Sequence, residues 1–253
     1  ATRLLEKEAD LTPKELTTYR MMVGCTNWVA RITRPDLNYD MVSLSTKFKG
    51  GKVQDLKEAK KVLANIVQNE ASITISSVGD LRKAELWLYT DASFGNLNNG
   101  ADSTGSYILL LINPKNGKCA PLDWKANKIK RVVNSTLAAE ALSLYAGLDA
   151  AIAMKNQLRM ILGKDYLFPL KAIVDNKSTV DTVHAAVSLT TEKRLRKEIG
   201  SIKEMMKKGK LQELKWVPTE LMLADALTKK GVNSLKLLKV MQTGRLGNDY
   251  LDS

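Results

Sequence analysis

Residues 86–91 read Leu-Trp-Leu-Tyr-Thr-Asp, a nearly continuous apolar run that ends in a carboxylate. Such a run is typical of a central strand that is buried on both faces of a sheet. An isolated ionised carboxylate in that place costs several kcal/mol of desolvation, so Asp91 requires a compensating positive charge nearby. The stretch therefore predicts the centre of a sheet and a charged site within it.

Three further carboxylates close or interrupt apolar segments in the same way: Glu140 in STLAAE, Asp175 at the end of LKAIVD, and Asp225 in LAD. Four buried acids on one scaffold are tolerable only if cations neutralise them. Ligand sets made only of oxygen favour a hard divalent ion, Mg²⁺ or Mn²⁺. Two such ions, roughly 3.5–4 Å apart, are a known device for in-line cleavage of phosphodiesters.

The 253 residues carry a formal net charge of +12, which is unevenly placed. Residues 1–80 hold 12 Lys and Arg against 10 Asp and Glu, whereas residues 81–253 hold 27 against 17. A basic surplus favours a polyanionic partner, most often a nucleic acid. A lysine-rich solvated surface is the alternative.

Cys25 and Cys119 lie far apart without metal-ligand spacing, which indicates a reducing compartment. The apolar run at residues 107–112 is much shorter than the about 18 residues of a membrane span, and the charged N-terminus does not resemble a signal peptide. We therefore expect an intracellular protein that does not contact a membrane. Because residue 1 is Ala and not Met, we also expect a piece of a longer chain.

Apolar residues at helical spacing predict three helices with short connections, a small bundle over about residues 11–69. The pattern then changes to that of an α/β domain. Strands are predicted at residues 86–91, 105–112, 119–124, 170–174 and 211–217. Helices are predicted at residues 136–161, 177–187, 190–208 and 221–229. We place the domain boundary at residue 80, with domains over 1–80 and 81–253.

Five motifs, in this order, resemble those of a ribonuclease H domain, most closely the copia type of long-terminal-repeat retrotransposon polyprotein. They are YTDAS at 89–93, STGSY at 103–107, STLAAE at 135–140, VDNKS at 174–178, and WVPTE leading into LADALTK at 216–229. Upstream, YRMMVG, TRPD and KEAKKVL resemble the segment that joins the reverse transcriptase to the nuclease. The resemblance covers about residues 16–230.

This resemblance implies a ribonuclease H-like five-stranded mixed sheet flanked by helices, preceded by a helical connection segment from the C-terminal end of the reverse transcriptase region. It implies that Asp91, Glu140, Asp175 and Asp225 are the catalytic residues and hold two Mg²⁺ or Mn²⁺ ions. The implied reaction is hydrolysis of the RNA strand of an RNA/DNA hybrid during reverse transcription. The implied partner is the upstream polymerase domain of the same polyprotein. The implied location is the cytoplasm, in a virus-like particle, with the nucleus as a second location.

Basic residues on two segments are candidates for holding the substrate backbone. On the helix predicted at 190–208, the residues Lys193, Arg196 and Lys197 face away from the apolar stripe and could follow phosphates. An ordinary solvated helix face is an equally good interpretation. Before the helix that bears Glu140, the candidates are Lys125, Lys128 and Arg131.

Distinguishing RNA from DNA requires contacts to 2′-hydroxyl groups, for which Ser93, Asn134 and Ser135 are the candidates. Many ribonucleases H carry a histidine close to the last aspartate, but this chain has none there. Its one histidine, His184, follows the fourth predicted strand and is expected to be a structural or surface residue. Trp87, Trp124 and Trp216 fall in predicted strands and are expected in the core.

The same residues also bear on other classes of function. Integrases of related architecture carry their glutamate after the second aspartate, whereas Glu140 precedes Asp175 here. The Tyr-x-Asp-Asp signature of the polymerase is absent, since no two aspartates are adjacent. A catalytically silent hybrid-binding module and a domesticated retroelement remnant remain as alternatives.

Overall fold

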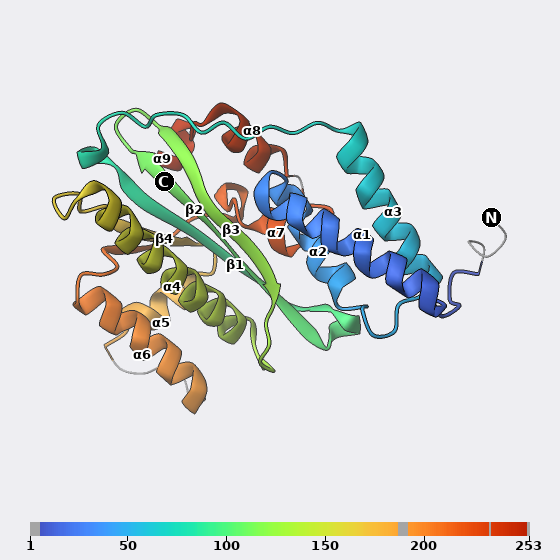
Figure 1. Ribbon diagram of the computed structural model, residues 1–253. Helices are drawn as coiled ribbons and strands as arrows, with labels where there is room; N and C mark the ends of the chain where they lie inside the picture. The colour runs from blue at the N-terminus through green and yellow to red at the C-terminus, as the bar shows by residue number, and fades with distance from the viewer. Residues whose placement is uncertain (1–5, 187–191, 233, 252–253) are drawn as a thin grey trace. The chain divides into compact units, whose positions relative to one another are not determined.

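The computed structural model describes residues 6–186, 192–232 and 234–251 (Figure 1). The chain divides into two compact units, Ala1–Ser72 and Ile73–Ser253. The segment just before residue 80, which the sequence assigns to the first domain, belongs to the second unit. The amide of Thr74 donates to the carbonyl of Met241 at 2.8 Å, and Val78 is buried in the core of that unit.

The first unit is helical, as predicted. Its elements are α1 (Pro13–Ile32), the 3-10 turn η2 (Pro35–Leu37), α2 (Asn38–Ser45) and α3 (Val53–Gln68). Helix α1 begins at a reciprocal cap in which Thr12 and Glu15 satisfy each other's backbone amides. Tyr19 lies fully buried in the core of this unit, and its hydroxyl donates to the carbonyl of Leu44 at 2.6 Å.

The second unit is built on a five-stranded mixed sheet. Its strands are β1 (Glu85–Leu97), β2 (Asp102–Asn113), β3 (Lys118–Lys128), β4 (Leu170–Val174) and β5 (Glu213–Trp216). Their order across the sheet is β3-β2-β1-β4-β5. Strands β1, β2 and β3 pair antiparallel, whereas β4 is parallel to β1, and β5 to β4. The predicted sheet is confirmed, and its apolar β1 lies at the centre.

Helices surround this sheet. They are α4 (Thr136–Leu162), α5 (Lys177–His184), α6 (Lys193–Lys207), α7 (Asp225–Thr228), α8 (Leu235–Thr243) and α9 (Asn248–Leu251), with 3-10 turns η3 (Leu81–Lys83), η4 (Asn98–Gly100) and η5 (Thr219–Leu221). The predicted helix at 221–229 is shorter than expected, because Met222 is extended and separates η5 from α7. Helices α8 and α9 were not predicted. Of the predicted helices 177–187 and 190–208, residues 187–191 lie outside the described residues.

Helix α4 packs closely against the sheet. A Cβ atom built on Gly147 would lie only 2.8 Å from Cγ2 of Thr90 in β1, so glycine is needed for this approach. Leu144 and Leu148, on either side of it, are fully buried in the core. By length and composition α4 could also cross a membrane, because it has 27 residues and contains an 18-residue window with a mean hydropathy of 1.4. A buried core helix meets the same criterion.

Candidate functional site

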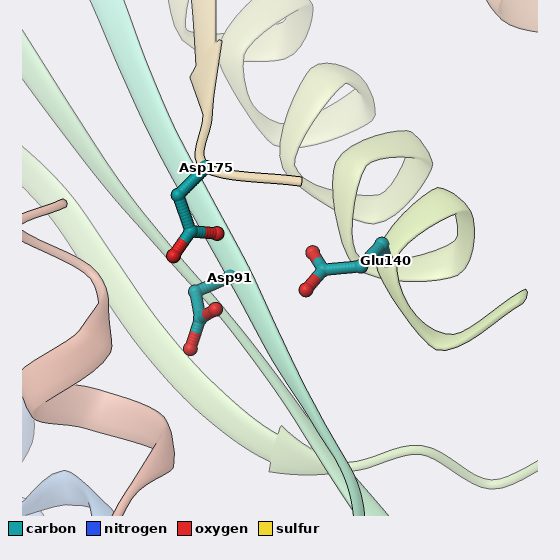
Figure 2. A group of neighbouring side chains, drawn as sticks. All are labelled: Asp91, Glu140 and Asp175. Atoms are coloured by element: carbon teal, nitrogen blue, oxygen red, sulfur yellow. The ribbon is translucent and has the colours of Figure 1, made fainter. Parts of the chain in front are cut away.

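Three of the four predicted acids meet at one place, and three different elements carry them there. Strand β4 runs parallel to β1 with Tyr89 opposite Ile173. Asp91 lies two residues further along β1, and Asp175 lies two residues after Ile173, directly after the end of β4. Glu140 approaches from the first turns of α4. One carboxylate oxygen of each residue lies within 4.8 Å of one from each of the other two (Figure 2).

A buried serine fixes the helix that carries Glu140. The hydroxyl oxygen of Ser143 lies 2.9 Å from the backbone carbonyl oxygens of both Asp91 and Ser106, which share its one hydrogen, and it accepts from the amide of Ser106 at 3.0 Å. These contacts join α4 to both β1 and β2. Because Glu140 precedes Ser143 by three residues, it lies on the same face of the helix and is directed at the same part of the sheet.

The cluster is strongly desolvated. Asp91 is 1% exposed and Glu140 3% exposed, and Oε2 of Glu140 is buried without a hydrogen-bond partner among the described residues. Burial raises the pKa of Asp91 to about 7, although Lys229 opposes the shift. Burial, with the charges of Asp91 and Asp175, raises the pKa of Glu140 to about 9. Clustered carboxylate oxygens, one of them unpartnered, are a donor set suited to a hard divalent cation.

The fourth acid, Asp225, lies beside this cluster and is linked to it by a lysine. Asp225 is 7% exposed at the start of α7, and its Oδ1 accepts a hydrogen bond from Nζ of Lys229. The same ammonium lies 3.8 Å from Oδ1 of Asp91. Sequence reasoning missed Lys229, although it stands four residues after Asp225, the spacing of a helical ion pair.

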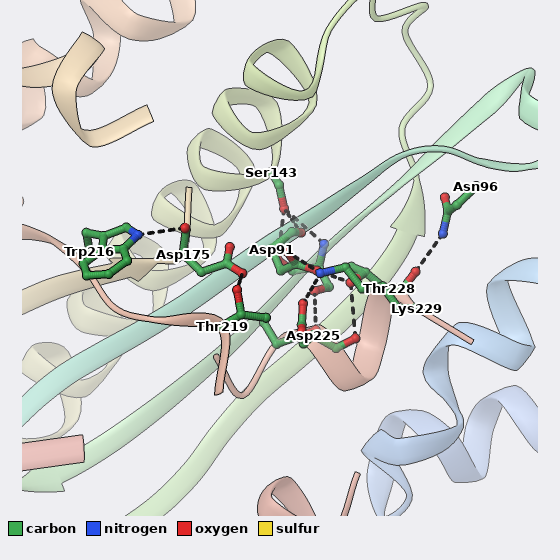
Figure 3. A network of polar contacts seen from close by, with 11 residues as sticks. Asp91, Asn96, Ser143, Asp175, Trp216, Thr219, Asp225, Thr228 and Lys229 are labelled. Atoms are coloured by element: carbon green, nitrogen blue, oxygen red, sulfur yellow. Dashed lines mark hydrogen bonds and ion pairs between the residues drawn. The ribbon is translucent and has the colours of Figure 1, made fainter. Parts of the chain in front are cut away.

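Two hydroxyl groups hold carboxylates of the site in place, and an indole holds the backbone of Asp175 (Figure 3). Thr228 donates through Oγ1 to Oδ2 of Asp91, and Thr219 donates to Oδ2 of Asp175 at 3.0 Å. The indole of Trp216 donates to the carbonyl of Asp175 at 2.8 Å. Trp216 is 45% exposed, so its prediction as a core residue is wrong, because it ends the short edge strand β5. Trp87 and Trp124 are buried as predicted.

The predicted substrate-binding residues fall into separate groups. Lys125, Lys128 and Arg131 line one cavity of about 900 Å³ that also includes Ser143 of α4 and Glu198 of α6. Lys197 lines a second hollow of about 360 Å³, together with Arg131, Arg194 and Glu198. Arg131 and Glu198 are shared by both hollows and form an ion pair at 2.5 Å. This ion pair thus borders both the cavity that holds Lys125 and Lys128 of β3 and the hollow that holds Lys197 of α6.

The other candidates have simpler surroundings. Lys193 and Arg196 are exposed on α6 and line neither of these two hollows. Ser93 is part-buried on β1, two residues beyond Asp91, so its side chain lies on the same face of the strand. Asn134 is exposed, and Ser135 caps α4 by accepting from the amide of Ala138 at 3.1 Å.

The one histidine also lies where the sequence suggested. His184 is exposed at the end of α5, with Nε2 3.4 Å from the carbonyl of Leu214.

A five-stranded mixed sheet flanked by helices is the architecture that the motif resemblance implied, and Asp91, Glu140 and Asp175 lie close together on it. The second unit has a ribonuclease H-like fold. A transposon Ty5-1 protein of Saccharomyces cerevisiae is 29% identical over 120 residues, which are 47% of this chain and 36% of that protein. The chain thus resembles a transposon protein but spans little more than a third of its length. No protein-family model matches the chain.

Solved structures similar to this chain are distant in sequence. The N-terminal RNase H domain of a Mycobacterium tuberculosis protein is 16% identical, with a TM-score of 0.41, and the similarity covers 62% of this chain and 96% of that one. RNase H1 from Halobacterium salinarum is 18% identical, with a TM-score of 0.40, 57% of this chain and 94% of that one being covered. The protease-reverse transcriptase of prototype foamy virus is 11% identical, with a TM-score of 0.35, and 81% of this chain and 29% of that one are covered.

Proposed function

We propose that this chain is the ribonuclease H segment of a copia-type retrotransposon polyprotein and hydrolyses the RNA strand of RNA/DNA hybrids during reverse transcription. The observation that carries the proposal is the meeting of Asp91, Glu140 and Asp175 within 4.8 Å on a ribonuclease H-like sheet. The likeness to a yeast transposon protein supports the retroelement origin.

The acids would hold two divalent ions, Mg²⁺ or Mn²⁺. Asp91, Glu140 and Asp175 would hold one of them, because their oxygens already converge and Oε2 of Glu140 lacks a partner among the described residues. Asp91 and Asp225 would hold the other. When bound, such ions supply activation of the attacking water and neutralisation of the leaving 3′ oxygen.

The remaining residues of the site orient the acids and hold the substrate. Thr228 and Thr219 each donate to one oxygen of an aspartate, which leaves the other oxygen of that aspartate for a ligand. The cavity lined by Lys125, Lys128 and Arg131 would take the phosphate backbone, since basic groups there neutralise successive phosphates. Ser93, on the same face of β1 as Asp91, is placed to meet a ribose hydroxyl.

The partner and the location follow from the same proposal. The helical first unit would connect the nuclease to a reverse transcriptase domain upstream in the polyprotein. Such a polyprotein would act in the cytoplasm within a virus-like particle, with the nucleus as a second location.

The test is cleavage of an RNA/DNA hybrid labelled on its RNA strand, in Mg²⁺, in Mn²⁺ and in EDTA, with DNA and RNA duplexes of the same sequence as controls. The expected result is cleavage of the hybrid RNA that requires the metal and is abolished by Asp91→Asn. Asp165→Asn removes an exposed aspartate and serves as the matched control. Cleavage that survives Asp91→Asn, or binding of the hybrid without any cleavage, would contradict the proposal.

A further inference from the structure

Lys229 is the one described cation whose charged group contacts two of the four acids. Its Nζ donates to Oδ1 of Asp225 and lies 3.8 Å from Oδ1 of Asp91 (Figure 3). Both aspartates are buried, whereas the lysine side chain is 36% exposed. The ammonium therefore lies between the two carboxylates that we assign to one ion, and its stem reaches solvent.

The backbone around Lys229 is tied to the sheet at both ends of α7. Before the helix, Oγ of Ser106 donates to the carbonyl of Ala224 at 3.2 Å. At the last residue of the helix, Nδ2 of Asn96 donates to the carbonyl of Thr228 at 2.7 Å. The backbone at Lys229 is thus held in place, while its four-carbon side chain can rotate and move the ammonium into or out of the site.

The two halves of the acid cluster differ in how they are neutralised. Oε2 of Glu140 is buried and lacks a hydrogen-bond partner among the described residues, so the half formed by Asp91, Glu140 and Asp175 is open to a cation. The half formed by Asp91 and Asp225 already has the ammonium of Lys229. Lysine cannot act as a metal ligand while protonated, so the ammonium and a metal ion exclude each other between these two oxygens.

We propose that Lys229 is a built-in competitor for one of the two metal positions. This inference rests on the proposed two-metal function. The first ion binds to Asp91, Glu140 and Asp175, where Oε2 of Glu140 has no partner among the described residues. The second ion binds between Asp91 and Asp225 only when the ammonium of Lys229 swings out, so the two ions bind with unequal affinity.

The first experiment measures how many Mn²⁺ ions the full chain binds. The electron paramagnetic resonance signal reports the free ion, and the bound ion is obtained by difference. We expect wild type to bind one ion tightly and a second weakly. Lys229→Met should strengthen the second step by roughly tenfold, the size of a typical coupling between two ligands. Lys229→Arg keeps the charge and should resemble wild type. Lys230→Met removes an exposed neighbouring charge and controls for net charge.

Because Lys229→Met removes the counterion of two buried acids, it could unfold the protein, and a second measurement uses wild type alone. Acetylation of lysines, read by mass spectrometry, should label Lys229 faster once Mn²⁺ fills the second position, while labelling of Lys230 stays constant. Equal Mn²⁺ affinities in wild type and Lys229→Met, or labelling of Lys229 that does not rise with Mn²⁺, overturns the inference.

These outcomes separate this inference from the proposed function. If hybrid cleavage and binding of two Mn²⁺ ions are both observed while Lys229 has no effect on either step, only the competition is wrong. If wild type binds no Mn²⁺ at all, the metal site itself is wrong, and the competition is refuted with it.

Discussion

Replacing Glu140 by glutamine should stabilise the metal-free protein, and increasingly so as the pH rises. Glu140 is 3% exposed, its Oε2 lacks a hydrogen-bond partner among the described residues, and its pKa is raised to about 9 by burial and by Asp91 and Asp175. At neutral pH the unfolded chain carries this carboxyl ionised. Folding must therefore either protonate Glu140 or bury its charge.

The sign of the pH effect follows from linkage. When the pKa of a carboxyl is higher in the folded state, native stability is greatest below the unfolded pKa and falls as the pH rises towards the folded value. Each proton taken up on folding costs about 1.4 kcal/mol per pH unit in that window. Between pH 5.5 and 7.5 Glu140 alone should thus remove about 3 kcal/mol from wild type. The neutral amide in Glu140→Gln avoids this loss.

The assay is thermal unfolding in EDTA, by calorimetry or circular dichroism, at constant ionic strength. For a unit the size of Ile73–Ser253, about 3 kcal/mol corresponds to roughly 6–12 °C in Tm. The Tm of Glu140→Gln minus that of wild type should therefore grow by roughly 6–12 °C from pH 5.5 to 7.5. Asp165→Asn, at an exposed position, should show no such trend. A difference that stays constant across this range would refute the reasoning.

Three further predictions follow from the packing, the thiols and the basic surface. Gly147→Ala places a methyl group 2.8 Å from Cγ2 of Thr90, so we expect a loss of about 1–3 kcal/mol in the free energy of unfolding, measured by urea denaturation. Cys25 is exposed, whereas Cys119 is buried and burial raises its pKa to about 12. A thiol reagent at pH 8 should therefore modify Cys25 in the native protein and reach Cys119 only on unfolding. Arg131→Gln should weaken binding of a hybrid and reduce the slope of log Kd against log salt by about one unit, measured by fluorescence anisotropy; an unchanged slope would mean that Arg131 serves only its ion pair with Glu198.

The elements of this protein were largely predictable because their signals are local. The apolar runs at 86–91 and 105–112 predict strands, and apolar residues at helical spacing after Ser135 predict a long helix. The local sequence pattern that predicts helices is weaker towards the C-terminus. Helix α8 is short, and the predicted helix at 221–229 is interrupted where Met222 is extended.

The sequence by itself determined which acids are embedded in apolar segments, in what order they occur, and hence that a cation must compensate them. Only the tertiary structure decided which acids meet: Asp91 and Asp175 lie level because β1 and β4 are parallel and in register, and Glu140 joins them because Ser143 joins α4 to both β1 and β2. It also decided that Lys229 lies between Asp91 and Asp225. The reason is physical: burial and charge type are properties of single residues and their neighbours in sequence, whereas a distance between oxygens far apart along the chain depends on strand register and helix docking.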